Sequence, residues 1–179
     1  MAAQFAAQGY IAVAIDLYGG KVATNGTDAR KYMGATDTAL ATSQLTTMAN
    51  YLRTHKDSTG KLGTVGWCFG GGWSLRTSIL AGYHGVGCVM YYGVPVEKAD
   101  ELVNLQADVL GIFAKKDGWI TEEVIGKFED LAKATGKNVE SNWYDAEHAF
   151  ANPTSPRYNE EAAQNANAKV LDFLKEKLK

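Results

Sequence analysis

The chain has 179 residues, of which 46% are hydrophobic and 21% are charged, and its formal net charge is −2. This length and composition suit one folded domain over residues 1–179 and exclude a disordered chain, a collagen-like repeat and a coiled coil. The charge balance offers no basic surface for nucleic acid and no polybasic membrane anchor, so a small molecule is the expected partner.

Cysteine usage and the N-terminus indicate the compartment. Cys68 and Cys88 are too few for a disulfide scaffold, and neither lies in a metal-ligand pattern. The first residues contain no Lys or Arg that would start a signal peptide, and Asp16 interrupts the following apolar stretch well short of a membrane span. We therefore expect a cytoplasmic protein with no membrane segment, no metal and no cofactor.

Short apolar runs alternate along the chain with helical patterns. The first run, residues 10–15, has the continuous hydrophobicity of a strand buried on both faces. Similar runs predict strands at 61–67, 85–91, 108–114 and 138–144, and apolar spacings of three and four predict helices around 41–52, 73–81, 124–132 and 163–174. Residues 16–37 read as a long loop with a short helix at 28–33. Strands that alternate with helices indicate an α/β fold with a mainly parallel sheet of about five strands flanked by helices.

A glycine-rich turn with one cysteine, Gly66-Trp67-Cys68-Phe69-Gly70, joins the second predicted strand to the next helix. This is G-x-C-x-G, the cysteine form of the nucleophile elbow. Its two glycines leave room for a sharp turn, and the helix N-terminus beyond supplies N–H groups that stabilise a thiolate or an oxyanion. We predict Cys68 as nucleophile and the Phe69 N–H as oxyanion donor. The plainer interpretation is a turn that holds a buried cysteine.

An aspartate and a histidine follow the last two predicted strands. Cys68, Asp117 and His148 thus come after three different strands in the order nucleophile, acid, histidine, which is the order of α/β-hydrolase triads. A thiol with an ordinary pKa is mostly protonated at neutral pH and needs a base, so His148 would take the proton and Asp117 would orient the ring. Asp145 and Glu147, close to the histidine, are the rival acids.

Other polar and aromatic residues have competing interpretations. His55 and His84 fall at a helix end and in a turn, and Cys88 lies in the middle of a predicted strand, where core packing is the expected role. Trp67 and Trp119 flank the triad candidates and are predicted to bind substrate, with core packing as the alternative. Arg30, Arg76 and Arg157 are the candidates for binding a substrate carboxylate, and no local motif selects one of them.

With these residues in place, the chain resembles the dienelactone hydrolase (carboxymethylenebutenolidase) family of the α/β-hydrolase fold. The similarity runs from end to end and is carried by residues 9–20 and 65–71, the Asp117 turn and residues 148–158. The cysteine nucleophile distinguishes this family from most other α/β-hydrolases, which use serine. The resemblance implies a triad at Cys68, Asp117 and His148, and hydrolysis of cyclic enol lactones such as dienelactone to maleylacetate-type acids without metal or cofactor.

The resemblance also implies a chain that is N-terminally truncated relative to the family. Family members have additional N-terminal strands and a loop that carries a glutamate and a second oxyanion-hole N–H. One of the absent strands lies between the strands represented here by residues 10–15 and 61–67. We expect either that these two strands pair directly, through a right-handed crossover that uses the helix over 41–52, or that a partner chain fills the gap by self-association.

The leading hypothesis is an ester or lactone hydrolase that works through a thioester on Cys68. The runner-up is an α/β-hydrolase-like domain that binds a small molecule with little or no catalysis.

Overall fold

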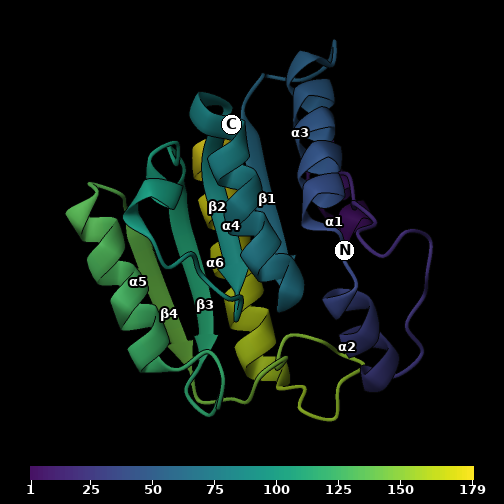
Figure 1. The fold of residues 1–179 in the computed structure, drawn as a ribbon, viewed down its shortest axis with the longest axis vertical. Coiled ribbons are helices and arrows are strands. Elements are labelled where there is room, and N and C mark those ends of the chain that lie inside the picture. The colour runs from purple at the N-terminus through teal and green to yellow at the C-terminus, as the bar shows by residue number, and fades with distance from the viewer. The chain divides into compact units, whose positions relative to one another are not determined.

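A computed structural model describes all 179 residues of the chain (Figure 1). The chain divides into two compact units, Met1–Gly60 and Lys61–Lys179, and each is described by itself. The expected single domain over residues 1–179 stays a prediction.

The unit Lys61–Lys179 is built on a four-stranded parallel sheet. Its strands are β1 (Leu62–Trp67), β2 (Gly85–Tyr91), β3 (Asp108–Ala114) and β4 (Val139–Tyr144), and they lie side by side in chain order. The α/β fold with a mainly parallel sheet is therefore confirmed. The predicted limits of β2 and β3 match the observed ones, and β1 and β4 each begin one residue later than predicted.

Helices cover both faces of this sheet, as Figure 1 shows. On one face α4 (Phe69–Ala81) and α5 (Glu122–Ala134) enclose a core with Leu75, Cys88 and Phe128. On the other face α6 (Glu160–Leu178) packs closely, because an added Cβ at Gly63 would lie 2.9 Å from Leu178. Two short 3-10 helices, Gly82–His84 and Ala99–Leu102, complete the unit.

The parallel arrangement determines where a site can form. The carboxyl ends of all four strands meet at one edge of the sheet, and in open α/β sheets ligands bind beyond that edge. The loops that follow β1, β2, β3 and β4 are therefore the segments that can bring chemical groups together.

The unit Met1–Gly60 contains three helices and no strand. They are α1 (Ala2–Ala7), α2 (Gly26–Gly34) and α3 (Thr38–Thr54). Asn25 and Asp37 cap the second and third helices, because each side chain accepts two backbone N–H groups of the first turn. The predicted helices at 28–33 and 41–52 are confirmed and are longer than expected.

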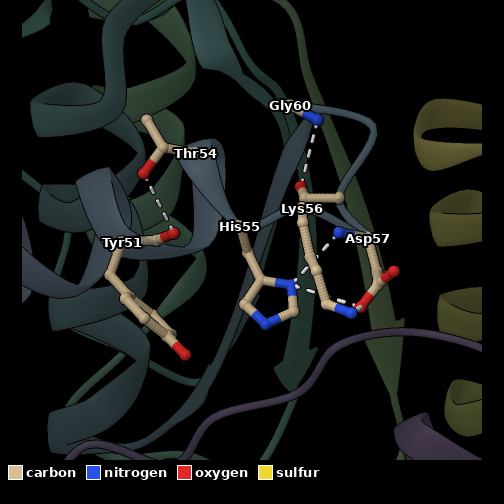
Figure 2. A network of polar contacts seen from close by, with 7 residues as sticks. Tyr51, Thr54, His55, Lys56, Asp57 and Gly60 are labelled. Carbon is tan, nitrogen blue, oxygen red and sulfur yellow. Dashed lines mark hydrogen bonds and ion pairs between the residues drawn. The ribbon is translucent and has the colours of Figure 1, made fainter.

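Local hydrogen bonds hold the turn that ends α3 (Figure 2). The N–H of Asp57 donates to Nδ1 of His55 over 3.3 Å, and the N–H of Gly60 donates to the hydroxyl of Ser58 over 3.0 Å. The imidazole of His55 therefore stabilises the end of α3, where the sequence analysis had located this residue.

The predicted strand at residues 10–15 is wrong, and the sheet has four strands rather than about five. The segment has no ladder partner, and Ile11 and Val13 are each 42% exposed. Continuous hydrophobicity favours a buried strand only where a neighbouring strand offers its backbone groups. Within the four-stranded sheet β1 pairs with β2, and direct pairing of residues 10–15 with residues 61–67 stays a prediction. Self-association through the sheet stays a prediction.

Candidate active site

The turn between β1 and α4 holds Cys68 in a strained backbone conformation. Its φ is +54° and its ψ is −118°, a region that residues other than glycine rarely occupy. A Cβ at Gly66 would lie 1.8 Å from the carbonyl oxygen of Gly70, so residue 66 must be glycine for the turn to close. A Cβ at Gly70 would meet nothing within 4 Å. Of the two glycines predicted to make room, Gly66 is the one that does so.

The same turn is fixed by β2 and by its own first helical turn. The N–H of Cys68 donates to the carbonyl of Tyr91 over 3.0 Å, and the carbonyl of Cys68 accepts the N–H of Gly71 over 2.9 Å. The cysteine therefore sits at the junction of strand and helix, with Phe69 as the first residue of α4.

Three predicted side chains, each from a loop that follows a different strand, lie in hydrogen-bonding contact. The Nε2 atom of His148 is 3.1 Å from Sγ of Cys68, and its Nδ1 atom is 2.6 Å from Oδ2 of Asp117. The imidazole thus bridges the thiol and the carboxylate. This order of contacts can pass a proton between sulfur and histidine while the carboxylate holds the ring.

The acid of this trio is buried and held by its own loop. The side chain of Asp117 is 2% exposed, and its Oδ1 atom accepts the N–H groups of Trp119 at 2.9 Å and Ile120 at 3.1 Å. Oδ2 is left for the histidine. The rival Asp145 instead forms an exposed ion pair with Lys116 at 3.0 Å.

The surroundings favour the protonated form of the histidine. The hydrogen bond with Cys68 is the largest influence and raises the pKa of His148 above its ordinary value, burial opposes the rise, and Asp117 adds to it. An imidazolium between a sulfur and a carboxylate gains from both partners. The surroundings of His148 therefore stabilise its imidazolium form.

The other predicted site residues have different surroundings. The ring of Trp119 is 6.1 Å from that of His148 and 53% exposed, so it borders the trio on the solvent side. The ring of Trp67 stacks on Tyr91 at 5.3 Å. The ring of Phe69 packs edge-to-face on Trp73.

The second cysteine and two of the candidate arginines have other neighbours. Cys88 is fully buried in β2, as core packing predicts. Arg76 faces Glu101 at 3.5 Å, and a nitrogen of Arg30 is 3.5 Å from the hydroxyl of Thr27. No group of three or more His, Cys, Asp or Glu side chains could hold a metal ion.

Sequence reasoning missed Tyr92, the residue after β2. Its ring centroid is 4.9 Å from that of His148, its φ is +34° and it is 1% exposed. A tyrosine between a strand and a glycine carries no signal of a positive φ. The one hint was its place at the carboxyl end of a predicted strand.

The comparisons with known proteins agree with this architecture. The structure superposes on a dienelactone hydrolase-like promiscuous phosphotriesterase from metagenomic libraries with a TM-score of 0.80 at 20% identity, covering 98% of this chain and 78% of that one. The fold is that of the α/β-hydrolases. A model of the dienelactone hydrolase family matches residues 1–178, and the chain belongs to that family.

Its relatives include carboxymethylenebutenolidases. It is 30% identical over 139 residues to carboxymethylenebutenolidase 1 of Cupriavidus pinatubonensis, covering 77% of this chain, and 32% identical over 117 residues to that of a Pseudomonas species, covering 65%. The chain spans 58% and 48% of the lengths of these two relatives.

None of its helices has the length and apolar character needed to cross a membrane.

Proposed function

We propose that this chain is a hydrolase of carboxylic esters and lactones, acting on enol lactones of the dienelactone type through a thioester on Cys68. The observation that carries the proposal is the unbroken contact from Sγ of Cys68 through the imidazole of His148 to the carboxylate of Asp117. The family and the carboxymethylenebutenolidase relatives supply the substrate class.

The first half of the reaction forms the thioester. His148 takes the thiol proton, and the Cys68 thiolate attacks the carbonyl carbon of the lactone. Negative charge then develops on the carbonyl oxygen near the start of α4, where the Phe69 N–H is the proposed donor. As the tetrahedral intermediate collapses, the ring C–O bond breaks and the imidazolium gives its proton to the departing enolate oxygen.

The second half releases the product. His148 accepts a proton from water as the water oxygen attacks the thioester carbon, and the C–S bond breaks to return the thiolate. The atoms of one water molecule end in the new carboxyl group and in the enol, which becomes a ketone. No redox step or further reactant is needed.

Trp119 is the proposed wall of the substrate pocket. Its exposed ring lies beside His148, where a planar unsaturated lactone could stack. Trp67 is a weaker candidate, because its ring already stacks on Tyr91.

The test compares wild type with Cys68→Ala and with Cys88→Ala, using dienelactone and a short-chain p-nitrophenyl ester. We expect turnover by wild type and Cys88→Ala, and a loss of at least about 10⁴-fold in kcat for Cys68→Ala, because removing a nucleophile disables the whole triad. An active Cys68→Ala variant would contradict the mechanism. Absence of wild-type turnover, with dienelactone still bound in a titration, would favour the small-molecule binding domain.

A further inference from the structure

The segment that ends β2, Tyr91–Gly93, contacts the nucleophile turn through its backbone. The carbonyl of Tyr91 accepts the N–H of Cys68 over 3.0 Å. A Cβ at Gly93 would lie 2.5 Å from backbone atoms of Gly71 and Gly72, so the segment presses directly on the first turn of α4. Its position is therefore fixed against the turn that carries the cysteine.

The middle residue of this segment contacts the histidine. The ring of Tyr92 lies 4.9 Å from the imidazole of His148 at an interplanar angle of 56°, and 5.7 Å from the ring of Phe150. Its N–H donates to the carbonyl of Ile112 over 2.8 Å. Three residues thus touch the nucleophile turn on one side and the histidine loop on the other.

Tyr92 is held in a conformation that its own chemistry does not favour. A φ of +34° is strained for a tyrosine, and such outliers persist where the surroundings over-determine them, often at functional sites. Burial raises the pKa of the phenol well above its ordinary value, the neighbouring Tyr91 and Cys68 add to this rise, and a hydrogen bond with the backbone of Ala151 opposes it. The side chain therefore acts as a neutral, buried ring rather than as an acid.

One rotation of the His148 ring would break both of its hydrogen bonds. Its two nitrogens face Cys68 and Asp117. Rotation about the Cβ–Cγ bond would swing both nitrogens away from these partners. Hydrogen bonds weaken steeply when misaligned, so a contact against the ring face that blocks this rotation stabilises the arrangement.

We propose that Tyr92 is a positioning residue that holds the imidazole plane of His148 in line with Cys68 and Asp117. The inference rests on the proposed function for its kinetic consequence, while the contact itself belongs to the folded protein. Trp119 also lies near the imidazole, but it is 53% exposed and 6.1 Å away, whereas Tyr92 is 1% exposed. The buried ring is the one that packing can hold rigid.

The test removes the ring and then restores it. Tyr92→Met takes away the aromatic face but fills much of the space with a flexible side chain, and Tyr92→Leu is a second variant of the same kind. Tyr92→Phe returns the ring without the hydroxyl. Phe113→Leu is the matched control, because Phe113 is a fully buried ring of β3 that packs against Trp143.

In dienelactone hydrolysis we expect Tyr92→Met and Tyr92→Leu to lower kcat about 10- to 100-fold with little change in KM, because misplacement of about 1 Å can cost 100-fold. Tyr92→Phe should restore most of kcat, and Phe113→Leu should lower thermal stability without this loss. Wild-type kcat in both ring-removing variants would overturn the proposal.

A readout without substrate separates this inference from the proposed function. In NMR titrations, a misaligned His148 in Tyr92→Met loses its bonds with Cys68 and Asp117, so its pKa should fall toward the ordinary value. If Tyr92 only covered the histidine, its removal would admit water and raise that pKa further, because burial opposes the rise. A fall supports the proposal even if no substrate is turned over, and an unchanged or higher pKa overturns it.

If neither ring-removing variant folds, the contact between Tyr92 and His148 can be tested in the wild-type protein. A nuclear Overhauser effect between ring protons of Tyr92 and His148, kept in Tyr92→Phe, is the expected result. Its absence from the folded wild type would overturn the contact on which the proposal rests.

Discussion

The two cysteines of this chain lie in the same unit and differ in almost every physical respect. Cys68 follows β1 in a strained turn, partly exposed, with the imidazole of His148 at 3.1 Å. Cys88 lies within β2, is fully buried, and faces the hydroxyl of Ser74 at 3.7 Å. Burial raises the pKa of the Cys88 thiol, and the hydroxyls of Ser74, Thr64 and Ser78 only moderate the rise.

The difference shows which neighbours allow a thiol to give up its proton. Both thiols have polar neighbours, but the hydroxyls around Cys88 bond among themselves and to backbone carbonyls, as in the 2.8 Å bond from Ser74 to Val89. They cannot accept a full proton. Cys68 has a base with its own carboxylate partner, which a thiolate needs.

Alkylation by iodoacetamide should separate the two thiols most strongly. We expect Cys68 in the native protein to react at least about 1000-fold faster than Cys88, because a buried thiol reacts only after local opening and each 1.4 kcal/mol of opening free energy is a factor of ten. Peptide mass spectrometry after timed quenching measures both rates. Equal alkylation rates in the native protein would contradict the predicted difference between Cys68 and Cys88. In denaturant the two rates should become similar.

Asp117→Asn should weaken catalysis next. We expect kcat to fall about 100- to 10⁴-fold, because the carboxylate orients His148 and stabilises its cation. Loss of that carboxylate also lowers the pKa of His148, so the activity limb that needs the imidazolium should move to lower pH. The kcat–pH profile measures both effects. Asp145→Asn is the control, and a larger loss in that variant would reassign the acid.

Gly66→Ala should destabilise the nucleophile turn, because its Cβ would overlap the backbone of Gly70. We expect the free energy of unfolding to fall by about 2 to 3 kcal/mol, as for other overpacked sites. Gly70→Ala meets open space within α4 and should leave that free energy unchanged or raise it by up to about 1 kcal/mol. Urea unfolding of the pair is the measurement, and equal values would show that the turn does not need the close approach.

Trp119→Ala should have the smallest effect. We expect KM for dienelactone to rise about three- to tenfold, or about 0.7–1.4 kcal/mol, since an exposed ring gives up only part of its stacking surface. kcat should stay near that of wild type, because the ring takes no part in proton transfer. A fall in kcat with KM unchanged would instead tie Trp119 to the placement of His148.

Much of the site was predictable because strand order places it. β2 and β3 begin and end where their apolar runs do, and parallel strands bring the residues after them to one edge. The contact of Cys68, Asp117 and His148 follows from that geometry. The sequence could not decide residues 10–15 in the same way, because a strand depends on a neighbour that a local pattern does not contain.

Strained backbone conformations were also hard to predict from the sequence. The sharp turn at Cys68 was expected from a known motif, whereas the positive φ of Tyr92 comes from tertiary contacts at the end of β2 and has no local signature. The glycines of the turn looked equivalent in sequence, although a side chain at Gly66 would meet the backbone and one at Gly70 would meet nothing. These differences depend on contacts in the folded chain, which a local sequence pattern does not contain.

The central claim is that Cys68 carries the acyl group during turnover, and trapping that species tests it most directly. Wild type mixed with a slowly hydrolysed p-nitrophenyl ester is quenched in acid and digested, and the peptides are weighed. We predict one added acyl mass on the peptide that contains Cys68, released by hydroxylamine, and none on the Cys88 peptide or in Cys68→Ala. Turnover with the acyl group on another residue, or with no acyl-enzyme under conditions where its hydrolysis is slow, would contradict it.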